Sequence, residues 1–365
     1  MNKQKKKLIL NKISIVGVGL IGGSIAKSIK NIEPNYLISA FDKKEILSTA
    51  KKSGIIDREL NSIEEAADSD IIFLCLPTDL SLKALSILAP LVKSNSIITD
   101  VSGVKYIFEK KWKKLKSNGK YIGGHPMTGK EQGGFENSDP LLFQNSIYIL
   151  SDKLKNESGP LLAIINILGA RIKFIDPKLH DKIVSMVSHL PQILSIALVN
   201  SLPDEEGQVN YLDFAAGGFR DMTRIASSKF NIWKSVIDLN SKNIVSSIRI
   251  IKKKLNTFEK AIKSGDIKSV ENSFESARIK RDEIPKNNKG FINPLYDIYV
   301  FVNDKPGVLS KLTTLLFNEG INIKDIELLK IREGTGGTFR ISFDSEQIAI
   351  KAKAFIEKSG FTVQS

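Results

Sequence analysis

Histidine is the side chain best suited to proton transfer near neutral pH, and the chain has three histidines, each in a distinctive local setting. His125 stands within GGHPMTG, residues 123–129, directly after the short run Tyr121–Ile122. An unperturbed histidine has a pKa of ~6.5, and general-base help from such a group typically gives ~10²- to 10⁴-fold in rate. We therefore predict that His125 is a general base. The alternative is a ring that only binds carbonyl groups of its own glycine-rich loop.

His180 and His189 stand nine residues apart in a segment whose apolar residues recur at helical spacing. At ~100° per residue they fall on opposite sides of a continuous helix, which argues against two ligands of one metal ion. No metal site is predicted. Pro191 follows His189 closely and kinks the helix, which is typical of a residue lining a site, although a hydrogen-bonded core histidine fits equally. His180 is predicted to cap a helix or to support the site.

Two arginines follow a glycine pair in AAGGFRDMTRIA, residues 215–226. The planar guanidinium group matches a carboxylate with two parallel hydrogen bonds. Arg224 is therefore a candidate ligand for an acidic substrate. Arg220 fits better as a partner of the adjacent Asp221 or as a charge at a helix end.

A glycine-rich loop, GVGLIGGS at residues 17–24, connects a predicted strand at 13–16 to a helix that runs to about residue 30. In a dinucleotide-binding turn, the first glycine makes the turn, the second admits the pyrophosphate, and the third lets helix and strand pack closely. The pyrophosphate then lies at the helix N-terminus, where the helix dipole favours an anion. The cofactor-binding residues predicted in this loop are Gly17, Gly19, Leu20, Ile21 and Gly22.

Asp42 ends the second predicted strand, 20 residues after the third glycine of the motif, where an acid accepts hydrogen bonds from the adenine ribose. A carboxylate there repels a 2′-phosphate, so the predicted cofactor is NAD rather than NADP. Lys43 and Lys44 follow at once, and we interpret them as a solvated turn, the alternative being that they hold such a phosphate. Two further cofactor contacts are predicted where the fourth strand ends, at Pro77 and Thr78.

The composition narrows the classes of partner. Lys+Arg 54 against Asp+Glu 40 leaves a net charge of +14, which suits an anionic metabolite, a nucleic acid or a membrane surface. The lysines are spread along the chain without interleaved aromatic residues, so no nucleic-acid partner is predicted. Asn11 and Lys12 interrupt the N-terminal apolar stretch, and no other apolar run approaches the ~20 residues that cross a bilayer, which predicts a soluble protein with no membrane partner. The single cysteine, Cys75, excludes disulfides and favours the reducing cytoplasm.

The pattern along the chain predicts an α/β protein with three domains. Residues 1–176 alternate strand and helix signals, as in a Rossmann-type dinucleotide-binding domain with a parallel sheet. Residues 177–283 show only helical periodicity and form an all-helical substrate and dimerisation domain. Residues 284–295, IPKNNKGFINPL, read as a linker, and residues 296–365 as a small βαββαβ module. In the first domain, strands are expected at 13–16, 37–41, 71–76, 97–99, 121–122, 146–150 and 172–175.

Taken together, the motifs resemble those of the prephenate dehydrogenase family over nearly the whole chain. The matching segments, in the family's order and spacing, are 17–24, DVSGVK at 100–105, GHP at 124–126, HD at 180–181, SHLP at 188–191 and TRIA at 223–226. The resemblance implies an NAD-dependent oxidoreductase that converts prephenate to 4-hydroxyphenylpyruvate, acting as a homodimer. It implies that His125 accepts the proton of the ring hydroxyl and that Arg224 holds a substrate carboxylate. It also places His189 in the substrate pocket and Trp233 beside it.

One position departs from the family pattern. Many members carry glycine and then serine where this chain reads Ser102-Gly103, which displaces the hydroxyl expected near the nicotinamide by one residue. Ser102 then reaches the site from its shifted position, or water substitutes for it.

The C-terminal module resembles an ACT domain, a fold that senses amino acids. Its motifs are NDKPGVL at 303–309 and GINI at 320–323. The resemblance implies a tyrosine effector that inhibits the enzyme, held by Asn303, Gly307 and Asn322 where two copies of the domain meet. A purely structural dimerisation module is the alternative.

Four other functions share part of this pattern. Homoserine dehydrogenase also joins a dinucleotide fold to ACT modules but has an α/β substrate domain, and a 3-hydroxyacid dehydrogenase needs a catalytic lysine and lacks the ACT module. Arogenate dehydrogenase has the same fold and chemistry, so prephenate and arogenate both stay open as substrates. The presence of both His125 and Arg224 argues against a non-catalytic sensor of NAD and an amino acid, whereas the displaced serine keeps this alternative open.

Overall fold

The computed structural model describes residues 12–130, 132–203, 209–283, 295–332 and 336–364. It forms two compact units, Met1–Val270 and Glu271–Ser365, and each is described here by itself. Apart from Leu295, the predicted linker at 284–295 lies outside the described residues.

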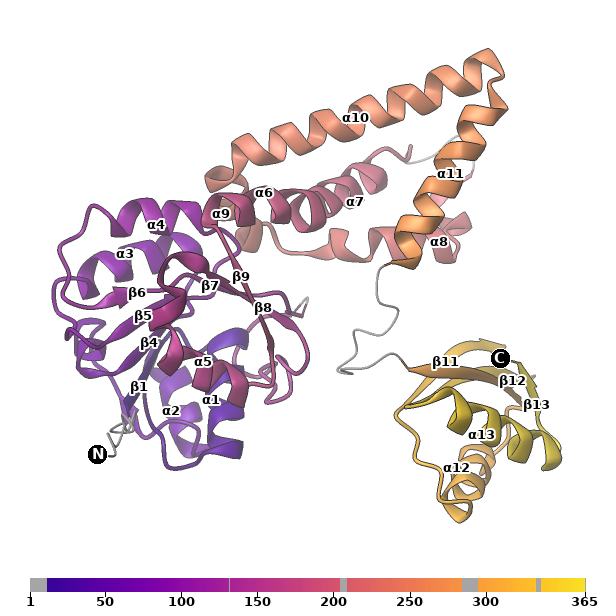
Figure 1. Cartoon of the computed structure of the whole chain (residues 1–365), viewed down its shortest axis with the longest axis horizontal. Coiled ribbons are helices and arrows are strands. Elements are labelled where there is room, and N and C mark those ends of the chain that lie inside the picture. Colours follow the sequence, from indigo (N-terminus) through magenta and orange to yellow (C-terminus); the bar gives the residue numbers. More distant parts are fainter. Residues whose placement is uncertain (1–11, 131, 204–208, 284–294, 333–335, 365) are drawn as a thin grey trace, which may run out of the picture. The chain divides into compact units, whose positions relative to one another are not determined.

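The first unit contains a parallel sheet, as the sequence predicts; β1, β4, β5 and β6 are labelled in Figure 1. It has six strands in the order β3-β2-β1-β4-β5-β6, and β3 was not expected from the sequence. The order reverses between β1 and β4, and in such sheets the ligand binds beyond the carboxyl ends of the strands at this reversal. The strands are β1 (Lys12–Val16), β2 (Leu37–Phe41), β3 (Arg58–Glu59), β4 (Ile71–Leu74), β5 (Ile97–Asp100) and β6 (Lys120–Tyr121).

Helices cover both faces of this sheet and bury its β-branched residues in two apolar cores. One core joins the sheet to α1 (Leu20–Ile32), α2 (Lys44–Lys52) and α5 (Gly159–Ile167). The other joins it to α3 (Thr78–Leu88), α4 (Tyr106–Trp112) and the short helix η1 (Glu64–Asp68). Because each strand is apolar on both sides, it can lie only between two such layers.

A second sheet corrects one prediction. The strands expected at 146–150 and 172–175 do not extend the main parallel sheet but form a three-stranded sheet, β7-β8-β9, made of β7 (Gly124–Pro126), β8 (Ile147–Ser151) and β9 (Arg171–Ile175). β7 pairs antiparallel to β8, whereas β8 and β9 are parallel. His125, expected in a loop, therefore lies in a strand, and its neighbour Gly124 presses on β5, since a Cβ there would stand 2.6 Å from the Asp100 carbonyl oxygen.

From residue 177 to residue 283, the regular elements of the described chain are helices, as the sequence predicts. The helices are α6 (Pro177–Val184), a π-helical turn η3 (Ser185–His189), α7 (Leu190–Asn200), η4 (Tyr211–Phe214), α8 (Gly217–Thr223), η5 (Arg224–Ser227), α9 (Phe230–Leu239), α10 (Ser241–Ser264) and α11 (Ile267–Asp282). The π turn precedes Pro191, and π turns of this kind occur often at functional sites.

One helical segment of 24 residues, Pro177–Asn200, is by length and composition long and apolar enough to cross a membrane, and an 18-residue window within it has a mean hydropathy of 1.5. The sequence pattern had suggested no run of this length. The same segment buries several polar side chains inside the first unit: His180, Asp181, His189 and Gln192.

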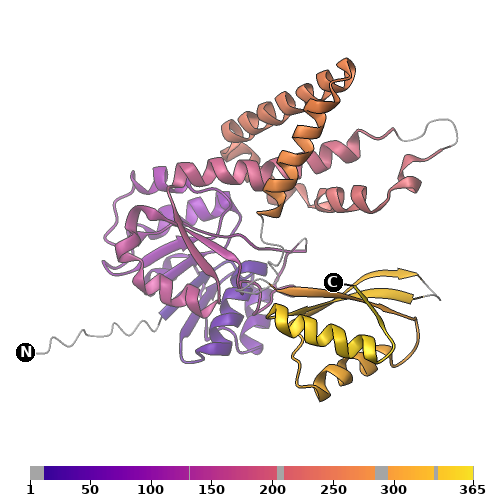
Figure 2. The same cartoon turned by 45° about the vertical axis from the view of Figure 1, so that its right-hand side comes forward.

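The second unit contains the βαββαβ module predicted at 296–365. Its antiparallel sheet has the order β11-β12-β10-β13, and two helices pack on one face of it (Figure 2). The elements are β10 (Tyr296–Val302), α12 (Val308–Asn318), β11 (Asp325–Arg332), β12 (Gly336–Phe343), α13 (Glu346–Lys358) and β13 (Thr362–Gln364).

Candidate active site

The glycine loop between β1 and α1 is packed too tightly for side chains at two of its three motif positions. A Cβ on Gly22 would stand 2.0 Å from the Gly17 carbonyl oxygen, and one on Gly17, whose φ is +104°, would stand 2.7 Å from the Cys75 carbonyl carbon. At Gly19 a Cβ would meet no atom within 4 Å. The loop therefore leaves open space at its second glycine, beside the start of α1, where a pyrophosphate would lie.

Asp42 lies at the end of β2 and is tied to this loop. Its Oδ2 accepts a hydrogen bond from the backbone N–H of Val18 at 2.6 Å, and its Oδ1 accepts one from Lys43 at 2.7 Å. Pro77 is exposed and Thr78 is buried at the start of α3, just beyond β4. The carboxyl ends of three neighbouring strands thus carry the predicted cofactor residues along one edge of the sheet.

A buried ionic cluster at the end of β5 had not been singled out from the sequence. The ammonium group of Lys105 pairs with the carboxylate of Asp100, and it also donates to the Gly124 carbonyl oxygen at 2.6 Å. The Tyr121 hydroxyl donates to Asp100 Oδ1 at 2.7 Å, and burial raises the pKa of Tyr121 well above its usual value. The cluster therefore ties β5, β6 and β7 together directly behind His125. Its sequence signal was an acid and a lysine five residues apart after a strand.

His125 is joined to His180 and Asp181 by a chain of hydrogen bonds. His125 Nδ1 lies 2.8 Å from His180 Nε2, and His180 Nδ1 lies 2.8 Å from Asp181 Oδ1. Asp181 also accepts the backbone N–H groups of Lys105 at 2.7 Å and Tyr106 at 3.0 Å. A carboxylate that accepts all these bonds fixes Nδ1–H on His180, so His180 Nε2 accepts and His125 carries its proton on Nδ1.

This proton arrangement leaves Nε2 of His125 as the basic nitrogen. It lies next to Gly103, where a Cβ would stand 3.9 Å from it. Burial, together with His180, Lys105 and His189, lowers the pKa of His125 well below its usual value, so the ring is neutral at pH 7. The structure thus gives His125 the form that a general base requires.

Ser102 does not replace the displaced family hydroxyl by direct contact. Its Oγ is buried and makes no hydrogen bond to His125 or to any other group in the described part of the chain. Its backbone N–H donates to Asp100 Oδ2 at 3.0 Å. A Cβ on Gly103 would stand 3.9 Å from His125 Nε2, so a serine at this position would approach the histidine.

His189 and Trp233 are brought together, as the resemblance implies. Their rings meet edge to face with centroids 5.9 Å apart. Asn240 Nδ2 donates to the Asp181 carbonyl oxygen at 2.8 Å and lies 3.2 Å from His189 Nδ1. Asn240 thus links His189 to Asp181, the residue whose carboxylate bonds His180. Burial lowers the pKa of His189 to about 4. In addition, α9 contacts the cofactor edge, because Ser235 Oγ donates to Asp79 Oδ1 at 3.4 Å.

Arg224 is exposed at the start of η5. This short helix is anchored to α7, because Gln192 Nε2 donates to the carbonyl oxygen of the next residue, Ile225, at 2.9 Å. The structure therefore places Arg224 on the helical side of the site.

Other candidates for chemistry fall away. Cys75 is not exposed, and burial raises the pKa of its thiol far above the usual range, so it is not a nucleophile. No group of three His, Cys, Asp or Glu side chains in the described ranges is placed to hold a metal ion.

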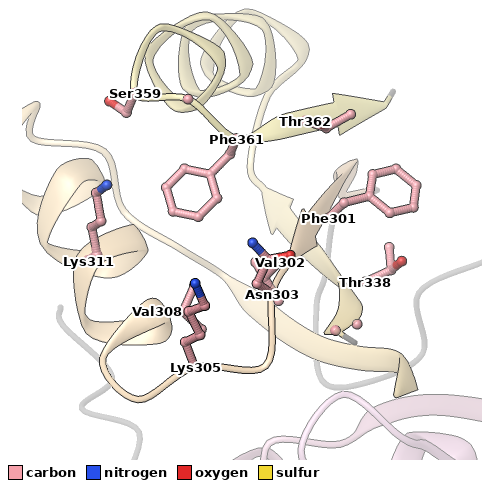
Figure 3. A pocket seen from close by; sticks show the side chains of 13 residues that line it. Phe301, Val302, Asn303, Lys305, Val308, Lys311, Thr338, Ser359, Phe361 and Thr362 are labelled. Atoms are coloured by element: carbon pink, nitrogen blue, oxygen red, sulfur yellow. The ribbon is translucent and has the colours of Figure 1, made fainter. Parts of the chain in front are cut away.

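The C-terminal module contains two adjoining cavities at the turn between β10 and α12. The larger, of about 680 Å³, is lined by polar and aromatic side chains that include Lys305, Lys311 and Phe361 (Figure 3). The smaller, of about 250 Å³, is more apolar and includes Gly307. Asn303 lines both, whereas Asn322 is exposed and lines neither. The structure therefore brings together two of the three predicted effector residues.

The buried neutral histidines predict a loss of stability in acid. The pKa of His189 is about 4 in the folded chain and ~6.5 when unfolded, so between these values only the unfolded state takes up the proton. Above pH ~6.5 this proton uptake does not change the free energy of unfolding, and at pH 5 it lowers that free energy by roughly 2 kcal/mol. The midpoint of urea unfolding, followed by tryptophan fluorescence, measures this, because Trp112 and Trp233 both lie in the first unit.

The matched variant is His189→Asn, whose amide can still contact Asn240 but does not titrate. Between pH 7.5 and pH 5 it should lose roughly 2 kcal/mol less stability than the unchanged chain. Equal losses in the two proteins would contradict this assignment.

Comparison with known proteins identifies the family. Models of the prephenate dehydrogenase nucleotide-binding domain, the prephenate dehydrogenase dimerization domain and the ACT domain match residues 25–173, 176–276 and 296–352. Prephenate dehydrogenase of Lactococcus lactis subsp. cremoris is 36% identical over 97% of this chain and 100% of its own. Prephenate dehydrogenase of Bacillus subtilis is 33% identical over 98% of this chain and 97% of its own.

Solved structures agree with these relatives. Prephenate dehydrogenase from A. aeolicus, in complex with hydroxyphenyl propionate and NAD+, is 30% identical and covers 76% of this chain and 100% of its own, with a TM-score of 0.69. Synechocystis arogenate dehydrogenase is 26% identical over 74% of this chain and 99% of its own, with a TM-score of 0.66. With its family models and its near full-length relatives in agreement, the chain belongs to the prephenate dehydrogenase family.

Proposed function

We propose that the chain oxidises prephenate with NAD to 4-hydroxyphenylpyruvate and CO2, with His125 as the general base. The observation that carries this assignment is the hydrogen-bond chain from Asp181 through His180 to His125, because it leaves a neutral ring with a basic Nε2 at the carboxyl edge of the sheet. Full-length relatives named prephenate dehydrogenase support the substrate. NADH absorbance with prephenate and with arogenate as substrates tests it, and clear preference for arogenate would overturn it.

The residues present fit NAD. The open space at Gly19, the carboxylate of Asp42 beside the loop and the edge at Pro77 and Thr78 suit a dinucleotide, and the unpartnered buried Oγ of Ser102 is a donor available to a bound group. Gly17, Leu20, Ile21 and Gly22 complete the cradle. When bound, NAD supplies the acceptor for the hydride that leaves the ring carbon of prephenate.

The protein's own residues then account for the rest of the chemistry. Arg224 holds a substrate carboxylate, and His189 with Trp233 forms a wall of the pocket on the helical side. The ring hydroxyl of prephenate faces His125 Nε2, which takes its proton as the carbon–oxygen bond becomes a carbonyl. Loss of the ring carboxylate as CO2 then makes the ring aromatic, and this makes the overall step effectively irreversible.

We propose further that the enzyme is a soluble cytoplasmic homodimer with limits 1–176, 177–283 and 296–365 for its domains. The described helices of the middle domain expose apolar side chains that another copy could cover: Leu179, Val187, Ile196, Met222 and Ile232. The match of residues 176–276 to a dimerization domain supports this interface.

Tyrosine is the proposed effector, bound in the ACT module. Asn303 and the backbone at Gly307 would hold its amino and carboxylate groups, and the apolar wall of the smaller cavity, formed by Leu309, Leu328 and Phe339, would hold its ring. Asn322 would contribute where two modules meet. Gly307 directly precedes α12 and has a φ of +83°. It carries no side chain, so the start of the helix is open to a carboxylate.

The base assignment predicts the effect of His125→Asn. Turnover should fall by ~10²- to 10⁴-fold, with little change in the KM for prephenate, because only the proton acceptor is lost. Arg224→Gln should instead raise the KM for prephenate more than it lowers kcat. Full turnover in the His125 variant would show that another group takes the proton.

The cofactor assignment predicts the effect of Asp42→Asn. The amide oxygen can still accept the Val18 N–H, but the charge facing a 2′-phosphate is gone and Lys43 and Lys44 become available to it. The ratio of kcat/KM for NAD to that for NADP should fall by about tenfold or more. Preference for NADP by the unchanged enzyme would mean that the lysines bind the phosphate.

The effector assignment predicts that Asn303→Ala raises the inhibition constant for tyrosine by about tenfold or more without changing kcat in its absence. Ser310→Ala is the control, because this exposed serine of α12 lines neither cavity. Calorimetry that detects no tyrosine binding to the intact protein would refute the site.

A further inference from the structure

The hydrogen-bond chain behind His125 has one feature that a single general base does not need, namely a second imidazole between the base and the carboxylate. His180 is fully buried and Asp181 is 5% exposed, and their bond and the bond between the two histidines are each 2.8 Å long. Both bonds involve nitrogens that can gain or lose a proton. An inert acceptor of the His125 Nδ1–H would have sufficed to orient the ring of His125.

We propose that the proton taken from the substrate moves the positive charge onto His180. The substrate O–H bond breaks and His125 Nε2–H forms, while His125 Nδ1–H breaks and His180 Nε2–H forms. His125 ends neutral with its proton on Nε2, and His180 ends as an imidazolium whose Nδ1–H bonds Asp181. This inference rests on the proposed function, in which His125 accepts the hydroxyl proton.

The charges around the two rings favour this direction. Burial is the largest cause that disfavours a cation on His125, followed by His180, by Lys105, which bonds the carbonyl of the preceding residue, and by His189. Burial also lowers the pKa of His180, but there the bond to Asp181 and the charges of Asp181 and Asp100 oppose the effects of burial and Lys105 and favour a cation. Tyr121, the remaining titratable group of the cluster, is kept neutral by its raised pKa.

Asp181 is held in place to receive this charge. Its carboxylate accepts two backbone N–H groups at the start of α4, and its carbonyl oxygen accepts the side chain of Asn240. His180 is fully buried, whereas the ring of His125 is partly exposed, so the proton returns to solvent through His125 after product leaves. The proton thus leaves His180 through His125, the same ring through which it arrived.

Two variants separate charge transfer from simple orientation. In His180→Gln the amide oxygen can accept His125 Nδ1–H and the amide nitrogen can donate to Asp181, but the side chain cannot take a proton. In His180→Leu both bonds are lost. Transfer of charge predicts that kcat falls by ~10²-fold in both variants while the KM for prephenate stays within about twofold.

The pH profile gives the second readout. In His180→Gln the proton must stay on His125, whose pKa burial, Lys105 and His189 still depress, so the acid limb of kcat should move to lower pH. Ser185→Ala is the control, because Ser185 follows His180 in the same helical segment. Its substitution removes a buried hydrogen bond to Ser247 of α10 and leaves the histidine chain intact. It should keep wild-type kcat and profile.

Near wild-type kcat and an unmoved acid limb in His180→Gln would overturn the proposal and leave His180 an orienting group. Loss of the same size in Ser185→Ala would also overturn it, by assigning the effect to helix packing. Absence of prephenate oxidation in the unchanged enzyme would instead refute the proposed function.

Nitrogen-15 NMR of histidine-labelled full-length protein tests the relay without substrate, because the chain has three histidines and His180→Gln assigns one set of signals. As the pH is lowered, His180 should be the first of the pair to carry protons on both nitrogens. While both rings are neutral, His125 should carry its proton on Nδ1, and as His180 becomes an imidazolium the proton of neutral His125 should move to Nε2. Earlier protonation of His125, or a proton on His125 Nε2 while His180 is still neutral, would overturn the proposal.

Discussion

Lys105 and Asp100 are both buried at the end of β5, where neither charge is stable without the other because removing one partner of such a pair costs ~3–5 kcal/mol. The pair also bonds the Tyr121 hydroxyl and the Gly124 carbonyl oxygen, which belong to β6 and β7. The strand that carries His125 is therefore set by electrostatics as well as by backbone pairing.

The same lysine connects the dinucleotide domain to the helical domain. Its backbone N–H bonds Asp181 on α6, while its side chain bonds Asp100 on β5. Asp181 then orders His180, and His180 orders His125. A single buried residue thus supports the base from two directions, through the strand beneath it and through the histidine beside it. Because the histidines of this site are neutral, they do not repel the positive charge of an oxidised nicotinamide. The excess of basic residues in the chain favours a substrate with carboxylates.

Much of this could be read from local patterns. The glycine loop, the alternating strands of the main sheet, the helical region after Pro177 and the βαββαβ module each follow from residues close in sequence, because turns, strand propensity and helical periodicity are local properties. The pairing of His189 with Trp233 and the place of Asp42 beside the loop came with the resemblance and with motif spacing. These features needed no knowledge of distant contacts.

Other features were decided only by the tertiary structure. Helical spacing places His180 and His189 on opposite sides of a regular helix, yet the π turn and Asn240 connect both to one network. The contact of His125 with His180 joins residues 55 positions apart, and the small sheet that holds His125 depends on pairing with β8. Ser102 and Arg224 show the same limit of sequence analysis. Residue type and spacing predicted both as site residues, but burial and the neighbouring elements determine where they lie. The sequence by itself determined which groups can do chemistry, whereas the buried charges and long-range pairings determined which of them meet, because their energies arise only between segments brought together by folding.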